Sequence, residues 1–101
     1  MSLLIKNAHL ISPGFEAKNA ALLIENGKIT KVFNDKETLP AADEVFDAEG
    51  NMLMPGFIDV HCHGCMGYEA TKEEADAIRI ISEGKISEGV TAYCPTTLTL
   101  P

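Results

Sequence analysis

The strongest constraint on the fold is a strand–helix–strand pattern in the second half of the chain. An apolar segment from Phe57 to His63 precedes a helical pattern at about residues 72–88, and a second apolar segment follows at Val90 to Cys94. Two strands that are joined through a helix lie parallel in one sheet, with a right-handed crossover. One such unit leaves strand edges unpaired, so the pattern predicts the beginning of a larger α/β sheet.

The helix of this unit carries its own start and stop signals. Residues 71–74, TKEE, match a capping box, in which the Thr hydroxyl and the Glu carboxylate satisfy free N–H groups of the first turn. Gly89 is expected just past the last turn, where a left-handed conformation ends many helices. Gly84 lies inside the helix and is expected to weaken it by up to ~1 kcal/mol relative to Ala.

The first half of the chain has the pattern of a β-rich domain. A strand is predicted at Leu3 to Ile11, and strands at Ala20–Ile24 and Ile29–Phe33 flank Asn26-Gly27, the strongest short hairpin signal. Short strands are also predicted at Glu44–Asp47 and Met52–Met54. The pattern changes at Pro55-Gly56, so we divide the chain into a β-rich domain, 1–54, and a domain that starts at residue 55.

Composition narrows the class of protein. The 101 residues carry a net charge of −7 without a basic cluster, which argues against a nucleic-acid binder. No apolar run has the roughly 18 residues that a membrane span requires, and residues 1–6 lack the pattern of a signal peptide. Three cysteines are an odd number and too few for a disulfide framework. We therefore expect a soluble, cytoplasmic protein in a reducing compartment.

The sharpest candidate site is the pair His61-x-His63. Side chains at i and i+2 of a strand point to the same face, so two imidazoles so spaced can bind one metal ion. Asp59 lies on the same face of the strand and is expected to orient one of the ligands without binding the metal itself. The pair lies at the carboxyl end of its strand, where (β/α)8 enzymes carry their active sites. The same pattern also fits polar residues on a half-exposed strand.

Cysteines overlap this site and suggest a competing interpretation. Cys62 and Cys65 form a C-x-x-C pair, which occurs in redox centres and in zinc sites. The predicted helix begins too far beyond Cys65 for a thioredoxin-like motif, and only Cys94 remains to extend a zinc site. Buried or incidental thiols are the favoured interpretation. The alternative is a non-catalytic metal- or thiol-binding β-rich module that uses His61, Cys62, His63 and Cys65.

Residues 55–64, PGFIDVHCHG, resemble the P-G-x-I-D-x-H-x-H-G signature of the amidohydrolase superfamily, metal-dependent hydrolases built on a (β/α)8 TIM barrel. The hairpin from Leu22 to Val32 resembles part of the small β-sandwich domain that precedes the barrel in that superfamily. Residues 88–97, EGVTAYCPTT, are similar to the second barrel strand of the family of N-acetylglucosamine-6-phosphate deacetylases. The resemblance extends over essentially the whole chain.

The resemblance implies an α/β protein in which 1–54 is the N-terminal part of the β-sandwich domain and 55–101 is the truncated start of the barrel. It implies hydrolysis of the amide of N-acetylglucosamine-6-phosphate, or of a related amino-sugar phosphate, with release of acetate. His61 and His63 would be ligands of a divalent metal, Zn or Fe, with Asp59 behind them. The catalytic carboxylate and the remaining ligands would lie downstream, so these 101 residues alone are expected to be inactive. Open strand edges lead us to expect a homo-oligomer.

Overall fold

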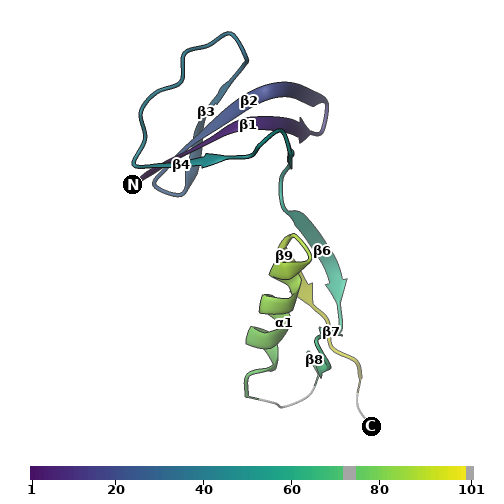
Figure 1. Ribbon diagram of the computed structural model, residues 1–101. Helices are drawn as coiled ribbons and strands as arrows, with labels where there is room; N and C mark the ends of the chain where they lie inside the picture. The colour runs from purple at the N-terminus through teal and green to yellow at the C-terminus, as the bar shows by residue number, and fades with distance from the viewer. Residues whose placement is uncertain (72–74, 100–101) are drawn as a thin grey trace. The chain divides into compact units, whose positions relative to one another are not determined.

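The computed structural model describes residues 1–71 and 75–99, and the chain divides into two compact units, Met1–Pro55 and Gly56–Pro101. Figure 1 shows the order of their elements along the chain. The first unit contains the strands β1 (Ser2–Ser12), β2 (Phe15–Glu25), β3 (Lys28–Phe33), β4 (Glu44–Asp47) and β5 (Met52–Leu53). The second contains β6 (Phe57–Cys62), β7 (Gly64–Cys65), β8 (Tyr68–Glu69), α1 (Ala77–Ser87) and β9 (Val90–Pro95).

The first unit is a mixed sheet with the strand order β3-β2-β1-β4, and β5 also pairs with β1. Strands β1, β2 and β3 are antiparallel neighbours, whereas β4 and β5 run parallel to β1. The hairpin between β2 and β3 turns at Asn26 and Gly27, whose φ angles of 51° and 77° are both positive, as the favoured two-residue turn requires. The β-rich first half and its Asn-Gly hairpin are therefore confirmed.

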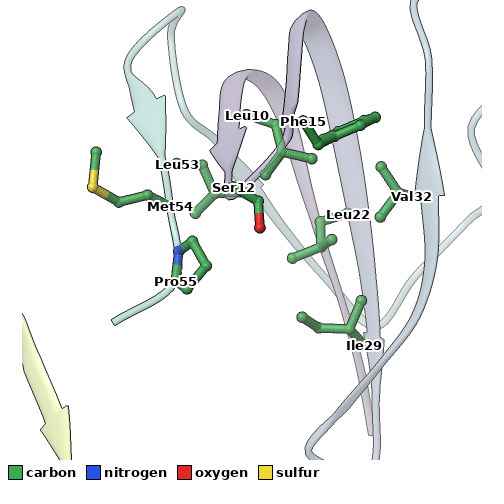
Figure 2. Close-up of a pocket in the computed structure, with 9 residues that line it drawn as sticks. All are labelled: Leu10, Ser12, Phe15, Leu22, Ile29, Val32, Leu53, Met54 and Pro55. Carbon is green, nitrogen blue, oxygen red and sulfur yellow. The ribbon is translucent and has the colours of Figure 1, made fainter. Parts of the chain in front are cut away.

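The sheet of the first unit carries apolar side chains on both faces, because Ala20 to Ile24 of β2 form a continuous apolar run. Leu4, Ala21 and Phe33 form a buried cluster, against which Leu23 packs. Leu22 instead lines an open cavity of about 280 Å³ whose walls are almost wholly apolar. Figure 2 shows the side chains that line this cavity, Leu10, Ser12, Phe15, Leu22, Ile29, Val32, Leu53, Met54 and Pro55.

The second unit is built on the predicted strand–helix–strand pattern. β6 and β9 are parallel, and α1, which lies between them in the chain, packs on β9. After β6 the chain forms the small antiparallel hairpin β7–β8, with Met66 and Gly67 at its tip. Gly64 is the first residue of this hairpin. Glycine is required there because a Cβ would overlap the carbonyl oxygen of Tyr68. The βαβ unit is confirmed, and a complete barrel remains a prediction.

The start of the helix differs from the prediction. α1 begins at Ala77 with Asp76 as N-cap, and no side chain caps it. The Thr71 hydroxyl instead accepts a hydrogen bond of 2.8 Å from the N–H of Leu98, so the predicted cap at Thr71 is wrong. Glu74, the other member of the box, lies outside the described residues. The Thr71 hydroxyl therefore takes part in a tertiary hydrogen bond with Leu98, whereas the local sequence pattern predicted that it would cap the helix.

The other end of the helix follows the prediction. Gly89 has a φ of 83°, and its N–H donates to the carbonyl of Ile86 over 3.0 Å. This is the left-handed residue that commonly follows a helix. Among the described residues, no helix is long and apolar enough to cross a membrane.

Candidate metal centre

Two histidines converge where β6 ends. His61 lies within the strand and His63 one residue beyond its last residue, Cys62. Their Nε2 atoms are 2.9 Å apart, and the rings meet edge to face with centroids separated by 4.7 Å. The structure therefore brings together the two imidazoles that the HxH spacing predicts to share a face.

The main chain beyond β9 holds the ring of His63. Its Nδ1 lies 3.0 Å from the carbonyl oxygen of Thr96, and the Thr96 N–H donates to the carbonyl of Cys62 over 2.7 Å. A carbonyl only accepts hydrogen bonds, so Nδ1 of His63 is the donor in this contact. In the neutral imidazole this tautomer leaves the lone pair on Nε2, which then accepts the Nε2–H of His61. The sequence carries no signal for this role of Thr96, because the contact is made by a backbone carbonyl.

The geometry of the two nitrogens fits a shared metal ion. Two nitrogens bound to one tetrahedral zinc at 2.0–2.1 Å lie about 3.3 Å apart, so the hydrogen-bonded nitrogens at 2.9 Å would separate by only about 0.4 Å to bind an ion. A metal-binding histidine usually donates its other ring N–H to a carbonyl or carboxylate, as His63 does to Thr96. His61 would bind through Nε2 after its proton moves to Nδ1. Within residues 1–71 and 75–99, no three His, Cys, Asp or Glu side chains gather as a metal site. The described part of the chain therefore offers two candidate ligands.

Asp59 contacts His61 through the main chain. Its Oδ1 accepts the backbone N–H of His61 over 3.1 Å, and its Oδ2 lies 2.9 Å from Nζ of Lys85 on α1. The Lys85 ammonium, and then the His61 N–H, hold the pKa of Asp59 below its usual range. The β6–β9 register is irregular between Asp59 and Cys62, so strict alternation does not extend from Asp59 to the histidines. Lys85 is a neighbour that sequence reasoning missed.

The cysteines of the C-x-x-C pair have different partners. Cys62 is buried, and its thiol lies 3.6 Å from the carbonyl oxygen of Gly64. The Cys65 thiol instead lies 3.4 Å from Oε1 of Glu88, and burial together with this carboxylate raises its pKa. Both cysteines are free. A raised pKa disfavours the thiolate that binds metals and attacks disulfides, which argues against the thiol alternative.

A β-rich first unit, followed by a parallel strand pair with two convergent histidines at the end of its first strand, matches the metal-dependent hydrolases of the amidohydrolase superfamily. Comparisons with known proteins agree, although no protein-family model matches the chain. N-acetylglucosamine-6-phosphate deacetylase of Bacillus subtilis (strain 168) is 32% identical over 98 residues, which cover 97% of this chain and 25% of that protein. The resemblance to this superfamily, and to these deacetylases within it, is confirmed.

Other relatives and solved structures extend the comparison. Dihydroorotase of Elusimicrobium minutum is 37% identical over 102 residues, covering 100% of this chain and 22% of that enzyme. The crystal structure of N-acetylglucosamine-6-phosphate deacetylase from Pasteurella multocida matches with a TM-score of 0.89 at 25% identity, over 100% of this chain and 27% of that one. L-hydantoinase from Arthrobacter aurescens matches at 0.64 and 28% identity, over 90% of this chain and 19% of that one. The chain spans about a quarter of the length of these relatives.

Proposed function

We propose that this chain is the N-terminal part of a metal-dependent amidohydrolase that removes the acetyl group of N-acetylglucosamine-6-phosphate or a related amino-sugar phosphate. The observation that carries the proposal is the 2.9 Å approach of the Nε2 atoms of His61 and His63 at the carboxyl end of β6. The match of the whole chain to deacetylases, in sequence and in fold, supports this substrate class. We place the enzyme in the cytoplasm.

In this proposal the chain supplies one side of a metal site. His61 and His63 would hold a divalent ion, Zn or Fe, and the Thr96 carbonyl would fix the ring of His63 through Nδ1 so that Nε2 stays available to the ion. When bound, the ion polarises the amide carbonyl and lowers the pKa of a coordinated water. The remaining ligands and the catalytic carboxylate belong to the rest of the enzyme. The 101 residues alone are therefore expected to bind a metal without turning over substrate.

A second candidate function is the hydrolysis of a cyclic amide. The observation that favours it is the match to a dihydroorotase over the full length of this chain, at a higher identity than the Bacillus subtilis deacetylase. Both reactions require the same polarised amide carbonyl, so the histidine pair serves either. The substrate is decided by the remainder of the enzyme.

Zinc binding tests the site. Zn²⁺ affinity of the chain, measured by competition with a chromophoric chelator, should fall at least about tenfold in His63→Ala, because a ligand is lost. Cys62→Ala should keep the affinity, since the buried thiol lies against the Gly64 carbonyl. Loss of zinc in Cys62→Ala with retention in His63→Ala would establish the non-catalytic thiol module instead.

A substrate panel tests the reaction. The whole enzyme, of which this chain is proposed to be the N-terminal part, should release acetate from N-acetylglucosamine-6-phosphate. It should leave dihydroorotate and hydantoin intact. Ring opening of either cyclic amide without acetate release would favour the second candidate. The matched control is His63→Ala in the same protein, which should lose activity on whichever substrate is turned over.

A further inference from the structure

The ion pair between Asp59 and Lys85 has no role in the site as described so far. Nζ of Lys85 lies 2.9 Å from Oδ2 of Asp59 and 3.4 Å from Oε2 of Glu88, and the Lys85 side chain is only 13% exposed. The other carboxylate oxygen of Asp59 accepts the His61 N–H. A continuous chain of contacts therefore leads from α1 through one carboxylate to the backbone of a proposed metal ligand.

The hydrogen bond between the His61 N–H and Asp59 lies in the part of β6 where the strand is irregular. The ladder with β9 loses its regular register between Asp59 and Cys62, and His61 lies inside that interval. A residue in an irregular strand lacks part of the cross-strand hydrogen bonding that usually holds the backbone. The Asp59 carboxylate supplies a replacement acceptor for the N–H of His61, and the ion pair with Lys85 keeps that carboxylate in place.

We propose that Lys85 is a positioning residue for the metal site: through Asp59 it holds the backbone of His61 so that its Nε2 meets that of His63. This inference rests on the proposed function, because it assigns Lys85 a role toward the ion that the histidines bind. Lys85 touches neither imidazole and does not ligate the ion. The connection is worth about tenfold in metal affinity, the lower end of the effect of outer-shell partners of metal ligands.

Substitution of both partners separates positioning from charge. Lys85→Met removes a positive charge near the site, so a purely electrostatic role predicts tighter binding of a cation. Asp59→Asn removes a negative charge and predicts weaker binding, although its side-chain oxygen still accepts the His61 N–H. Positioning predicts that both substitutions weaken binding, by about tenfold each, and that the double variant is no weaker than either one alone.

The experiment measures Zn²⁺ affinity of the 101-residue chain for Lys85→Met, Asp59→Asn and the double variant. Lys85→Arg keeps the positive charge, and its Zn²⁺ affinity should stay within about threefold of the parent chain. This is less than the roughly tenfold loss expected when an outer-shell partner of a metal ligand is removed. Arg79→Met is the matched control, because Arg79 lies on the same helix and pairs with Asp76 and Glu83 rather than with β6. Arg79→Met should bind zinc as the parent chain does.

A second measurement needs no metal. Because the His61 N–H donates to Asp59, its amide proton should exchange with solvent faster in Lys85→Met and at the parent rate in Arg79→Met. Helical circular dichroism identifies any variant that does not fold. If Lys85→Met fails in this way, the double variant decides the question, because charge alone predicts the affinity of the parent chain and positioning predicts binding about tenfold weaker.

Each remaining outcome has a defined meaning. Opposite effects of Lys85→Met and Asp59→Asn, or no effect of either, would overturn the positioning role. If His61→Ala and His63→Ala weaken binding while these two variants do not, only the positioning role fails. If neither histidine variant weakens binding, the proposed metal site itself is wrong.

Discussion

Gly84 shows how one residue can serve packing at the expense of local propensity. From the sequence it is a weak point of the helix, but the structure places it beneath the β7–β8 hairpin. A Cβ at this position would lie 2.6 Å from Cγ of Met66 and 2.8 Å from Sγ of Cys65. Gly84 is buried, so the absence of a side chain is what lets the hairpin pack closely on α1.

We therefore expect Gly84→Ala to destabilise the chain by about 1 kcal/mol in urea unfolding. Alanine gains up to ~1 kcal/mol in helix propensity, and overpacking costs ~1–3 kcal/mol, so the steric loss should prevail. Met66→Ala combined with Gly84→Ala should recover part of the loss, because one of the two obstructing side chains is shortened. An increase in stability for Gly84→Ala would contradict this prediction, because it would show that the hairpin shifts to accommodate the added methyl group at little cost in free energy.

At the scale of elements, the parallel pairing of β4 with β1 is secured at its end by Asp47. The carboxylate accepts the N–H of Glu49 over 2.8 Å and the side-chain amide of Asn7 over 3.1 and 3.2 Å. The Glu49 N–H, and then the Asn7 amide, lower the pKa of Asp47. Asn7 has a φ of 53° and lies where the β1–β2 register shifts, so this carboxylate joins β4 to an irregular point of β1.

The lowered pKa predicts a pH dependence of stability. A carboxyl whose pKa is lower in the folded chain stabilises the fold above its unfolded pKa of about 3.9, and this contribution is lost as the pH falls through the folded value. The free energy of unfolding should therefore fall less between about pH 5 and about pH 2 in Asp47→Asn than in the parent chain. Glu44→Gln, the same chemical change within β4, is the control. Equal acid sensitivity of Asp47→Asn and the parent would contradict this prediction.

At the scale of the whole molecule, the second unit leaves apolar strand residues uncovered. Ile58 and Val60 of β6 are 70% and 74% exposed, and within the described residues β6 and β9 form a sheet of two strands. Exposed apolar strands with open edges pair readily with other chains. We therefore propose that the 101-residue chain self-associates through this sheet.

Light scattering tests this association, with 10.9 kDa as the mass of a single chain. The parent should give a mass above this value that rises with concentration, and Val60→Lys should lower it. Ile86→Lys is the control, because Ile86 is comparably exposed but lies on α1. A parent that stays at the mass of one chain at all concentrations would refute the proposal.

Local signals were sufficient for much of the architecture. Asn26-Gly27 predicts its hairpin because both residues tolerate a positive φ, and Gly89 predicts the end of α1 for the same reason. The βαβ unit, with β6 and β9 parallel, follows from the apolar pattern of two strands separated by a helix. The HxH spacing predicts that His61 and His63 share a face, because a strand alternates every two residues.

Tertiary contacts decided the rest. Thr71 carries a capping pattern, but the N–H of Leu98 takes its hydroxyl, and α1 begins where Ala77 and Ile81 become buried. The Thr96 carbonyl contacts His63, and the Lys85 ammonium connects to His61 through Asp59. Both groups lie more than twenty residues along the chain from these histidines. A backbone carbonyl has no side-chain signature, and a lysine on a helix has many possible partners. Which group meets which histidine is therefore determined by how the helix and strands pack, because only packing brings distant residues within hydrogen-bonding distance.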